Sequence, residues 1–217
     1  MEYLLNLQVQ SGAPDTCAYF LGALEVTKEN ASPQITPGLW LVWRYEGRHT
    51  LSYYLRRRDT LAALGAALGV PEEAAAAVCV RQLLENARDL HRIGIVHRDI
   101  KPQNIIICET TQRCKFVDLG ACADLRRGTN FDPKEAILDP LYCPPEQYVV
   151  PSEATGANLA QQNALQKGIN APVLWARYRP DRFDVYGIGL ILMQLCLPAL
   201  RTDRGLRAFS IGLEKAG

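Results

Sequence analysis

Three side chains that could act together in catalysis lie close to one another in the sequence: Asp99, Lys101 and Asn104. A further carboxylate, Asp118, follows on the next predicted hairpin. Phosphoryl transfer needs groups of these types: a base to accept a hydroxyl proton, a cation to face the moving phosphate, and an amide and a carboxylate to hold Mg²⁺. Taken singly, each residue also has an ordinary interpretation, because Asp and Asn are common in turns.

The composition allows one sizeable core, or one large lobe with a small partner, since 48% of the 217 residues are hydrophobic. The 24 basic and 23 acidic residues nearly cancel, so we expect no nucleic-acid partner. The basic run at 56–58 is followed at once by Asp59 and is typical of a solvated helix end. Seven cysteines form no Cys-x-x-Cys pair, and we expect reduced, mostly buried thiols.

No segment of the sequence predicts a membrane span. The longest apolar run, 185–197, has about thirteen residues, whereas a span needs roughly 18 or more. We therefore expect a buried core helix over 184–197. The start of the chain has no basic region and no small-residue cleavage pattern, so it does not resemble a signal peptide.

Hydrophobic periodicity predicts the elements that must position these groups. The clearest is a long helix over 71–94, with proline and two acids in its first turn. Its apolar stripe consists of Val80, Leu83, Leu84, Ala87 and Leu90. The other expected elements are the tail of a helix at 1–10, strands at 18–26 and 39–43, a short helix at 50–64 before a Gly/Ala-rich loop, and short strands at 95–96, 105–107 and 115–117. We expect the strand at 39–43 to be buried, and 147–183 to form an irregular insert.

Four motifs in this order resemble those of eukaryotic protein kinases. The run 97–104 resembles the catalytic loop, 118–120 the metal-binding triplet with Leu in place of Phe, 144–146 the close of the activation segment, and 184–189 the start of the central hydrophobic helix. The resemblance implies an α+β fold with two lobes. A small β-rich lobe and hinge would occupy 1–46 and be incomplete, and a mainly helical lobe would occupy 47–217, with the insert at about 147–183.

The resemblance also implies a role for each residue of the catalytic run. Asp99 would orient and deprotonate the acceptor hydroxyl, and Lys101 would neutralise the transferring phosphate, as in serine/threonine kinases. Asn104 and Asp118 would bind Mg²⁺. Asp184 would anchor the backbone of the catalytic loop.

ATP would be the nucleotide cofactor. By the same resemblance, Arg44, Tyr45 and Glu46 would offer backbone groups to adenine, Trp43 would be the gatekeeper, and Ile106 would close the adenine pocket from below. Three other residues would serve structure. These are Glu2, Gly120 and Glu146.

Parts of the family pattern do not occur in the sequence. No Gly-rich loop and no strand lysine of the Val-Ala-Ile-Lys type precede residue 1. Glu2 is the best candidate for the helix carboxylate that would pair with such a lysine, and a plain helix-start acid is an equal alternative. Asp139 stands where serine/threonine kinases usually place a threonine. A second carboxylate near Asp99 would raise one of the two pKa values unless Lys101 lies between them.

A closer resemblance is to the chloroplast state-transition kinases of plants and green algae. It is carried by the runs 40–47, 118–126, 138–142 and 180–184, and by the long insert. This resemblance implies a thylakoid-anchored protein that acts on the stromal side of the membrane. Its protein substrates would be antenna proteins of the light-harvesting complex II type.

A second function remains open from the sequence. The chain could be a kinase-like scaffold that docks antenna proteins or another kinase without transferring phosphate. The intact Asp99, Lys101, Asn104 and Asp118 favour catalysis, whereas the missing phosphate-gripping elements favour docking.

Thr129 is the only Ser or Thr between Asp118 and Glu146, and Arg98 precedes the proposed base. A phosphate on Thr129 could pair with Arg98 and order the segment, or Asp132 and Glu135 could supply the charge instead. If the phosphate acts, Thr129→Ala lowers the rate of phosphate transfer in a kinase assay and leaves the unfolding temperature nearly unchanged. Full activity of that variant would rule the phosphate out.

Overall fold

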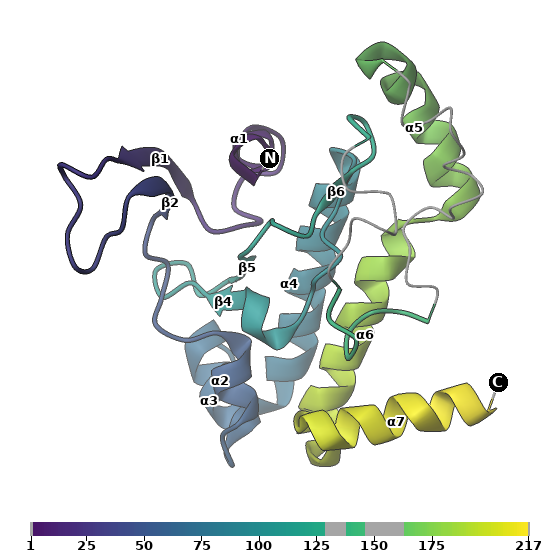
Figure 1. Cartoon of the computed structure of the whole chain (residues 1–217). Helices are drawn as coiled ribbons and strands as arrows, with labels where there is room; N and C mark the ends of the chain where they lie inside the picture. Colours follow the sequence, from purple (N-terminus) through teal and green to yellow (C-terminus); the bar gives the residue numbers. More distant parts are fainter. Residues whose placement is uncertain (1, 129–137, 146–162, 217) are drawn as a thin grey trace.

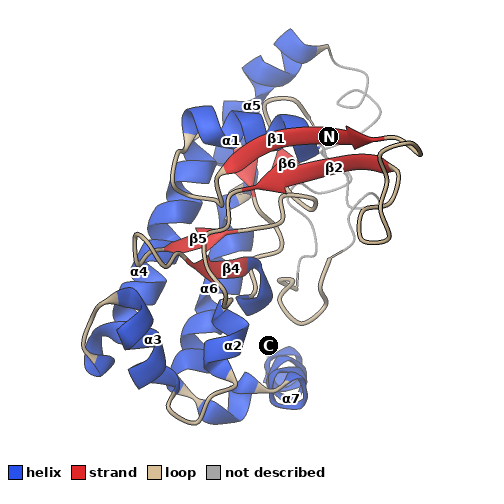
Figure 2. Cartoon of the chain, turned by 90° about the vertical axis from the view of Figure 1, so that its left-hand side faces the viewer, coloured by secondary structure: helices blue, strands red, loops and turns tan. Residues whose placement is uncertain are grey.

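The structure is a computed structural model that describes residues 2–128, 138–145 and 163–216. A small lobe of one helix and two strands lies against a larger, mainly helical lobe (Figure 1). Figure 2 shows the small lobe above the β4–β5 hairpin, with helices α2, α3 and α7 at the far end of the molecule.

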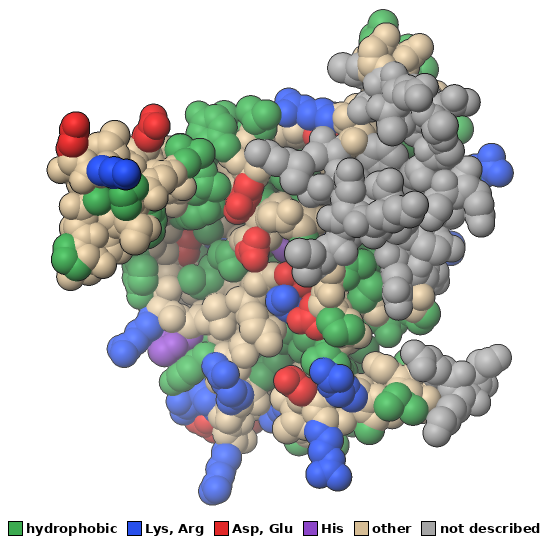
Figure 3. Space-filling view, viewed as in Figure 1, with side chains coloured by type: hydrophobic (Ala, Val, Ile, Leu, Met, Phe, Trp, Pro, Cys, Tyr) green, Lys and Arg blue, Asp and Glu red, His purple; other side chains and the backbone are tan. Residues whose placement is uncertain are grey.

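The small lobe consists of α1 (Glu2–Gly12), β1 (Phe20–Val26) and β2 (Gly38–Trp43). The two strands pair antiparallel, with Phe20 opposite Trp43 and Val26 opposite Gly38. The helix and both strands confirm the sequence prediction. The prediction that the second strand is buried was wrong, because Leu39 is 67% exposed and no residue of β2 is buried. Within the described residues this sheet has only two strands, and hydrophobic side chains lie uncovered over α1 and beside the hairpin (Figure 3).

The large lobe is built around α4 (Glu72–Arg92) and α6 (Asp181–Cys196), which pack side by side. The predicted stripe on α4 holds for Leu83, Ala87 and Leu90, which are buried, but Leu84 is 42% exposed. The buried face is completed by four residues that the hydrophobic pattern did not include. These are Ala75, Cys79, Gln82 and Asn86. Two of them are polar because they bind the strand beside the helix: Gln82 accepts from the Cys114 N–H and Asn86 donates to the Cys114 carbonyl.

Two short helices, α2 (Leu51–Leu55) and α3 (Thr60–Leu68), precede α4. The prediction of a Gly/Ala-rich loop after residue 64 was wrong, because the alanines continue the helix to Leu68. Alanine has the highest intrinsic helix propensity, so the residues of this segment themselves favour a helix. Gly69 ends α3 in the left-handed conformation, with a φ of 66°.

Two small hairpins hold the catalytic run in place. Strand β3 (Ile95–Val96) pairs with β6 (Ala123–Asp124), and β4 (Ile105–Ile107) pairs with β5 (Cys114–Phe116). A short 3-10 helix, η1 (Pro102–Asn104), turns the chain between β3 and β4. The predicted short strands are therefore confirmed, within a residue or two.

The insert contains a helix, α5 (Ala164–Tyr178), which corrects the prediction of irregular structure. Asn163 and Gln166 form a capping box at its start. Pro172 inside the helix obscured it, because proline usually interrupts helices. The apolar spacing is nevertheless helical. Ala171, Leu174, Trp175 and Tyr178 form one face, which packs on Val96 and Phe183.

The chain continues through η3 (Pro198–Arg201) to α7 (Asp203–Ala216). Arg201 ties this end to α6 by donating to the carbonyls of Gln194 and Leu195. Among the described residues no single helix is long and apolar enough to cross a membrane, and only the bent pair α3 and α4 meets the length and composition jointly. All seven cysteines are free and five are buried, as predicted.

Gly187 sets how closely α6 approaches the catalytic run. A Cβ atom there would lie 2.7 Å from the carbonyl oxygen of Ile100, whereas a Cβ at Gly189, on the same helix, would meet nothing within 4 Å. We therefore expect Gly187→Ala to lower the free energy of unfolding by about 1–3 kcal/mol through overpacking. The matched change Gly189→Ala should raise it by up to about 1 kcal/mol through helix propensity.

Urea unfolding of both variants measures this difference. Equal effects of the two substitutions would contradict the close approach of α6 to residue 100.

Candidate active site

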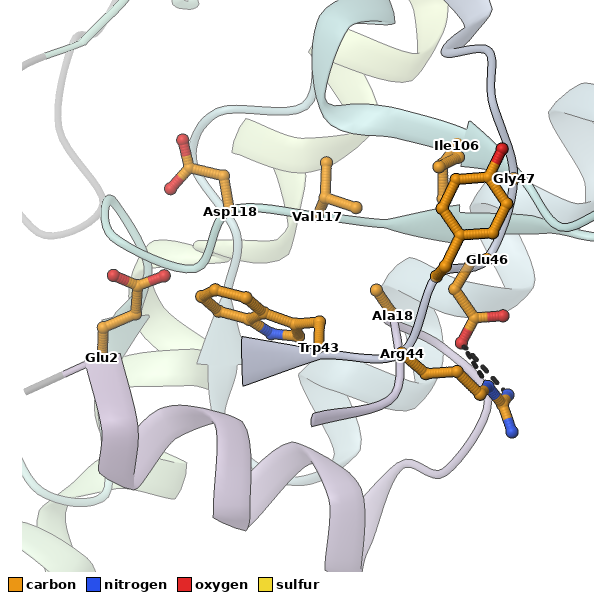
Figure 4. A pocket seen from close by; sticks show the side chains of 10 residues that line it. Glu2, Ala18, Trp43, Arg44, Glu46, Gly47, Ile106, Val117 and Asp118 are labelled. Carbon is orange, nitrogen blue, oxygen red and sulfur yellow. Dashed lines mark hydrogen bonds and ion pairs between the residues drawn. The ribbon is translucent and has the colours of Figure 1, made fainter. Parts of the chain in front are cut away.

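A pocket of about 410 Å³ lies between the two lobes. Glu2, Trp43 and Asp118 lie at one end of it, and Ile106 and Glu46 at the other (Figure 4). The lining residues come from the start of α1, the segment before β1, the end of β2, the segment 44–47 that follows it, β4 and the residues that follow β5. They are Glu2, Ala18, Trp43, Arg44, Tyr45, Glu46, Gly47, Ile106, Val117 and Asp118. Of the residues that the sequence suggested for nucleotide binding, Arg44, Tyr45, Glu46, Ile106 and Asp118 line this pocket, whereas Lys101 and Asn104 are not among its lining residues.

The catalytic run brings Asp99 and Asn104 into direct contact. The Asn104 amide nitrogen donates to Asp99 Oδ2 over 2.7 Å and to the Asp99 carbonyl over 3.0 Å. The turn η1 makes this contact possible, because it folds Asn104 back over the residues before it. With its nitrogen used in this way, the Asn104 amide oxygen is the atom that could bind a cation.

One oxygen of Asp99 has no hydrogen-bond partner among the described residues. Oδ2 is held by Asn104 and Lys101, but Oδ1 is buried and unpaired. A buried carboxylate oxygen normally accepts a hydrogen bond, so an unpaired one is a site at which a ligand donor would be stabilised. Asp99 Oδ1 is therefore an acceptor that the described residues leave unused.

Lys101 lies between two carboxylates. Its Nζ is 3.0 Å from Asp99 Oδ2 and 3.3 Å from Asp139 Oδ2. Burial alone would lower the pKa of Lys101, but the two ion pairs outweigh it and raise that pKa above its ordinary value. The Lys101 ammonium therefore lies between the Asp99 and Asp139 carboxylates, which is the arrangement that a second carboxylate near Asp99 required.

Asp118 is held in a strained conformation at the mouth of the pocket. Its φ is 64°, which non-glycine residues rarely adopt, and its Oδ1 accepts from the Gly120 N–H over 3.1 Å. The carboxylate of Asp118 and the amide oxygen of Asn104 are the oxygen ligands that Mg²⁺ prefers. Among the described residues no three His, Cys, Asp or Glu side chains gather as a metal site. Mg²⁺ usually takes one or two protein oxygens and shares the rest with phosphates, so the pair fits such an ion.

Asp184 fastens the catalytic run to the core helices. Its Oδ1 accepts from the Arg98 N–H at 2.8 Å, and its Oδ2 from the His97 N–H at 2.9 Å and from His91 Nε2 at 2.8 Å. The side chain is fully buried. Burial would raise the pKa of Asp184, but His91 and the backbone donor on His97 lower it below its ordinary value. These bonds also hold Arg98 at its unusual φ of 65°.

Glu2 begins α1 and lies at the same end of the pocket as Asp118. Partial burial and the nearby Asp118 carboxylate raise the pKa of Glu2. Trp43 joins α1 to β2, because its indole nitrogen donates to Asn6 Oδ1 over 2.9 Å. Both residues line the pocket, and the pairing expected of Glu2 stays a prediction.

Two of the backbone groups expected to face adenine are already used within the protein. The Arg44 N–H donates to the Tyr19 carbonyl, and the Glu46 carbonyl accepts from the Glu109 N–H, each at 2.8 Å. We call residues 44–46 the hinge. Adenine would therefore meet other backbone groups of the hinge. The Glu46 N–H is the natural candidate for a donor.

Thr129 and Glu146 lie outside the described residues. Arg98, the proposed partner of a phosphate on Thr129, is buried and donates from Nε to the Ala121 carbonyl over 2.7 Å.

Sequence reasoning also missed two neighbours of the site. His91 was interpreted only as structural, and Lys115 was not singled out, although a lysine within a short apolar strand is an unusual pattern that could have flagged it.

The fold and this site define the class of protein. A model of the protein kinase domain matches residues 24–159. The chain therefore belongs to the protein kinase family, which confirms the resemblance seen in the motifs.

Its curated relatives include two chloroplast enzymes of Arabidopsis thaliana. The chain is 38% identical to serine/threonine-protein kinase STN8, chloroplastic, over 98% of its own length and 44% of the relative. It is also 38% identical to serine/threonine-protein kinase STN7, chloroplastic, over 99% of its length and 39% of the relative. The chain thus spans less than half of the length of these relatives.

A solved structure shares the whole fold. The crystal structure of a Stt7 homolog from Micromonas algae, soaked with ATP, aligns with a TM-score of 0.85 at 33% identity, and covers 100% of this chain and 63% of that one. The predicted two-lobed kinase fold is confirmed.

We expect Asp184→Asn to lower the free energy of unfolding by about 1–3 kcal/mol at pH 7, because the amide leaves a buried donor without an acceptor. The folded pKa of Asp184 lies below the unfolded value, so the ion's stabilisation is present above about pH 4 and is lost as pH falls through the folded pKa. The difference between wild type and variant should therefore shrink on acidification below about pH 4.

Urea unfolding at pH 7 and at several points below pH 4 checks this. The exposed Asp59→Asn is the matched control and should change little. A difference that stays constant down to pH 3 would contradict the assignment.

Proposed function

We propose that this chain carries the catalytic site of a serine/threonine protein kinase, which transfers the γ-phosphoryl group of ATP to protein hydroxyls. The observation that supports this best is the state of Asp99. One oxygen is fixed by Asn104 and Lys101, and the other is buried with no partner among the described residues. A base held in this way is oriented before the substrate arrives.

Each residue of the site has a role in this reaction. Asp99 Oδ1 would accept the hydrogen of the acceptor hydroxyl, which orients the oxygen for attack. Lys101, anchored by Asp99 and Asp139, would face the negative charge on the transferring group. Asp184 keeps both in place through the backbone of His97 and Arg98.

The nucleotide and Mg²⁺ would be held by the pocket. The hinge and Ile106 would contact adenine, and Asn104 and Asp118 would hold Mg²⁺ beside the phosphates. When bound, the ion would neutralise the charge that develops on the phosphate oxygens. Glu2, at the same end of the pocket, and Gly120, which fixes the Asp118 carboxylate, support that end.

We propose antenna proteins of the light-harvesting complex II type as the substrates, and photosynthetic state transitions as the process. The support is the similarity to two kinases whose names place them in the chloroplast. The protein would then be anchored to the thylakoid membrane and act on its stromal side.

Transfer of labelled phosphate from ATP and Mg²⁺ tests the reaction, with isolated antenna protein and a generic protein as acceptors. Asp99→Asn should lower the rate by at least about a hundredfold, because it removes the base. The control Gly189→Ala lies on the exposed side of α6 and should retain full rate.

Transfer that survives Asp99→Asn would refute the assigned base. Transfer to the generic acceptor alone would refute the antenna substrate. No transfer by the wild type, with nucleotide still bound, would favour the docking scaffold instead.

A further inference from the structure

A buried ion pair lies directly beside the hinge. Glu46 Oε1 is 3.2 Å from Lys115 Nζ, and both side chains are only 2% exposed. Ion pairs of this kind are costly, because two charges must leave water. Glu46 also lines the pocket between the lobes, so the pair is placed where it could position groups that contact a nucleotide.

Glu46 joins several segments of the chain at one carboxylate. Its Oε1 also accepts from the Tyr19 N–H at 3.0 Å, and its Oε2 accepts from the Cys108 thiol at 3.1 Å. The Arg44 guanidinium binds the same carboxylate from the solvent side, as the dashed lines in Figure 4 show. The residue before β1, the hinge, the residue after β4 and strand β5 thus meet here.

The hinge backbone is pressed onto the same hairpin. The Glu46 carbonyl accepts from the Glu109 N–H over 2.8 Å. A Cβ atom at Gly47 would lie 2.5 Å from the Ile107 carbonyl oxygen, so only glycine allows this approach. Backbone and side chain therefore fix the hinge against β4 and β5 together.

The hydrogen bonds and the ion pair of Glu46 affect the pKa of its carboxylate. Burial alone would raise the pKa of Glu46, but the Tyr19 N–H, the Cys108 thiol and the Lys115 ammonium lower it to about 2. The other charged and titratable groups that face the pair are Arg44, Cys108 and the exposed Asp15. The carboxylate of Asp15 is 4.0 Å from Lys115 Nζ. The Glu46 carboxylate thus stays ionised at neutral pH.

Lys115 lies on the strand that leads to the expected metal ligand. It belongs to β5, pairs with Ile106 across the hairpin, and is followed by Val117 and Asp118, which line the pocket. Glu46 itself carries, on its backbone, the N–H that could meet adenine. One ion pair therefore connects the adenine end of the pocket to the strand that leads to its phosphate end.

We propose that the Glu46–Lys115 pair is a positioning element that sets the hinge backbone relative to Asp118, so that one nucleotide fits both ends of the pocket. This inference rests on the proposed use of ATP. It predicts that losing the pair weakens Mg²⁺-ATP, which contacts both ends, more than adenosine, which contacts the hinge alone.

The experiment compares wild type with Lys115→Met and with the double variant Glu46→Gln/Lys115→Met. Titration calorimetry gives the dissociation constants of adenosine and of ATP with Mg²⁺, and thermal unfolding gives stability. The single variant leaves a buried carboxylate without its cation and should unfold at lower temperature. The double variant removes both charges and should recover much of that stability.

We expect the dissociation constant of Mg²⁺-ATP to rise by about tenfold or more in both variants, since small errors of position are costly when two sites must be matched. Adenosine should be weakened less. The control Asn86→Ala removes a bond to the Cys114 carbonyl on the other side of β5, and should lower the unfolding temperature without changing either dissociation constant.

Nucleotide binding that recovers together with stability in the double variant would overturn the proposal, because the pair would then act only in folding. Equal weakening of adenosine and Mg²⁺-ATP would also overturn it. These outcomes are measured without phosphate transfer, so they are distinct from a failure of the kinase assignment. Wild type that binds neither ligand would overturn both.

Discussion

The buried carboxylate of Asp184 is the interaction on which the rest of the site depends. A fully buried charge is stable only when its oxygens are satisfied, and here three donors do so. Two of these donors are backbone N–H groups of the catalytic run and the third is a side chain of α4. The requirement to satisfy one charge on α6 therefore fixes the path of the segment that carries Asp99 and Lys101.

Strain at the site is tolerated because this framework is rigid. Arg98 and Asp118 both have positive φ values, which cost of order 1–3 kcal/mol each. Arg98 is held by Asp184 and by its own bond to the Ala121 carbonyl. Asp118 follows β5, whose residue Phe116 is fully buried and bonds to the segment at 16–18. The core helices and the short hairpins thus supply the constraint that the reactive groups could not maintain alone.

The elements that could be predicted were those whose local pattern agrees with their environment. Helix α4 has both a capping signal and a period, and the catalytic run has side-chain types that suit one chemistry. Three features were missed from the sequence, for different physical reasons. The exposure of β2 depends on what covers the strand, not on its own residues. Helix α5 was missed because Pro172 lies inside it, although its apolar face has a helical period. The Glu46–Lys115 pair joins residues that only the folded chain brings together, so neither residue alone indicates a partner.

The catalytic run and the hinge follow the same electrostatic logic. In the catalytic run, Lys101 is held between Asp99 and Asp139, and at the hinge, Glu46 is held by Lys115 and Arg44. In each case a charge that faces the pocket or supports it has its orientation fixed before any ligand arrives. Preorganised charges stabilise a transition state more than mobile ones, because they need not reorient during the reaction. Asp139 contributes to this in a way that a threonine could not, since a carboxylate holds the ammonium of Lys101 by charge as well as by a hydrogen bond.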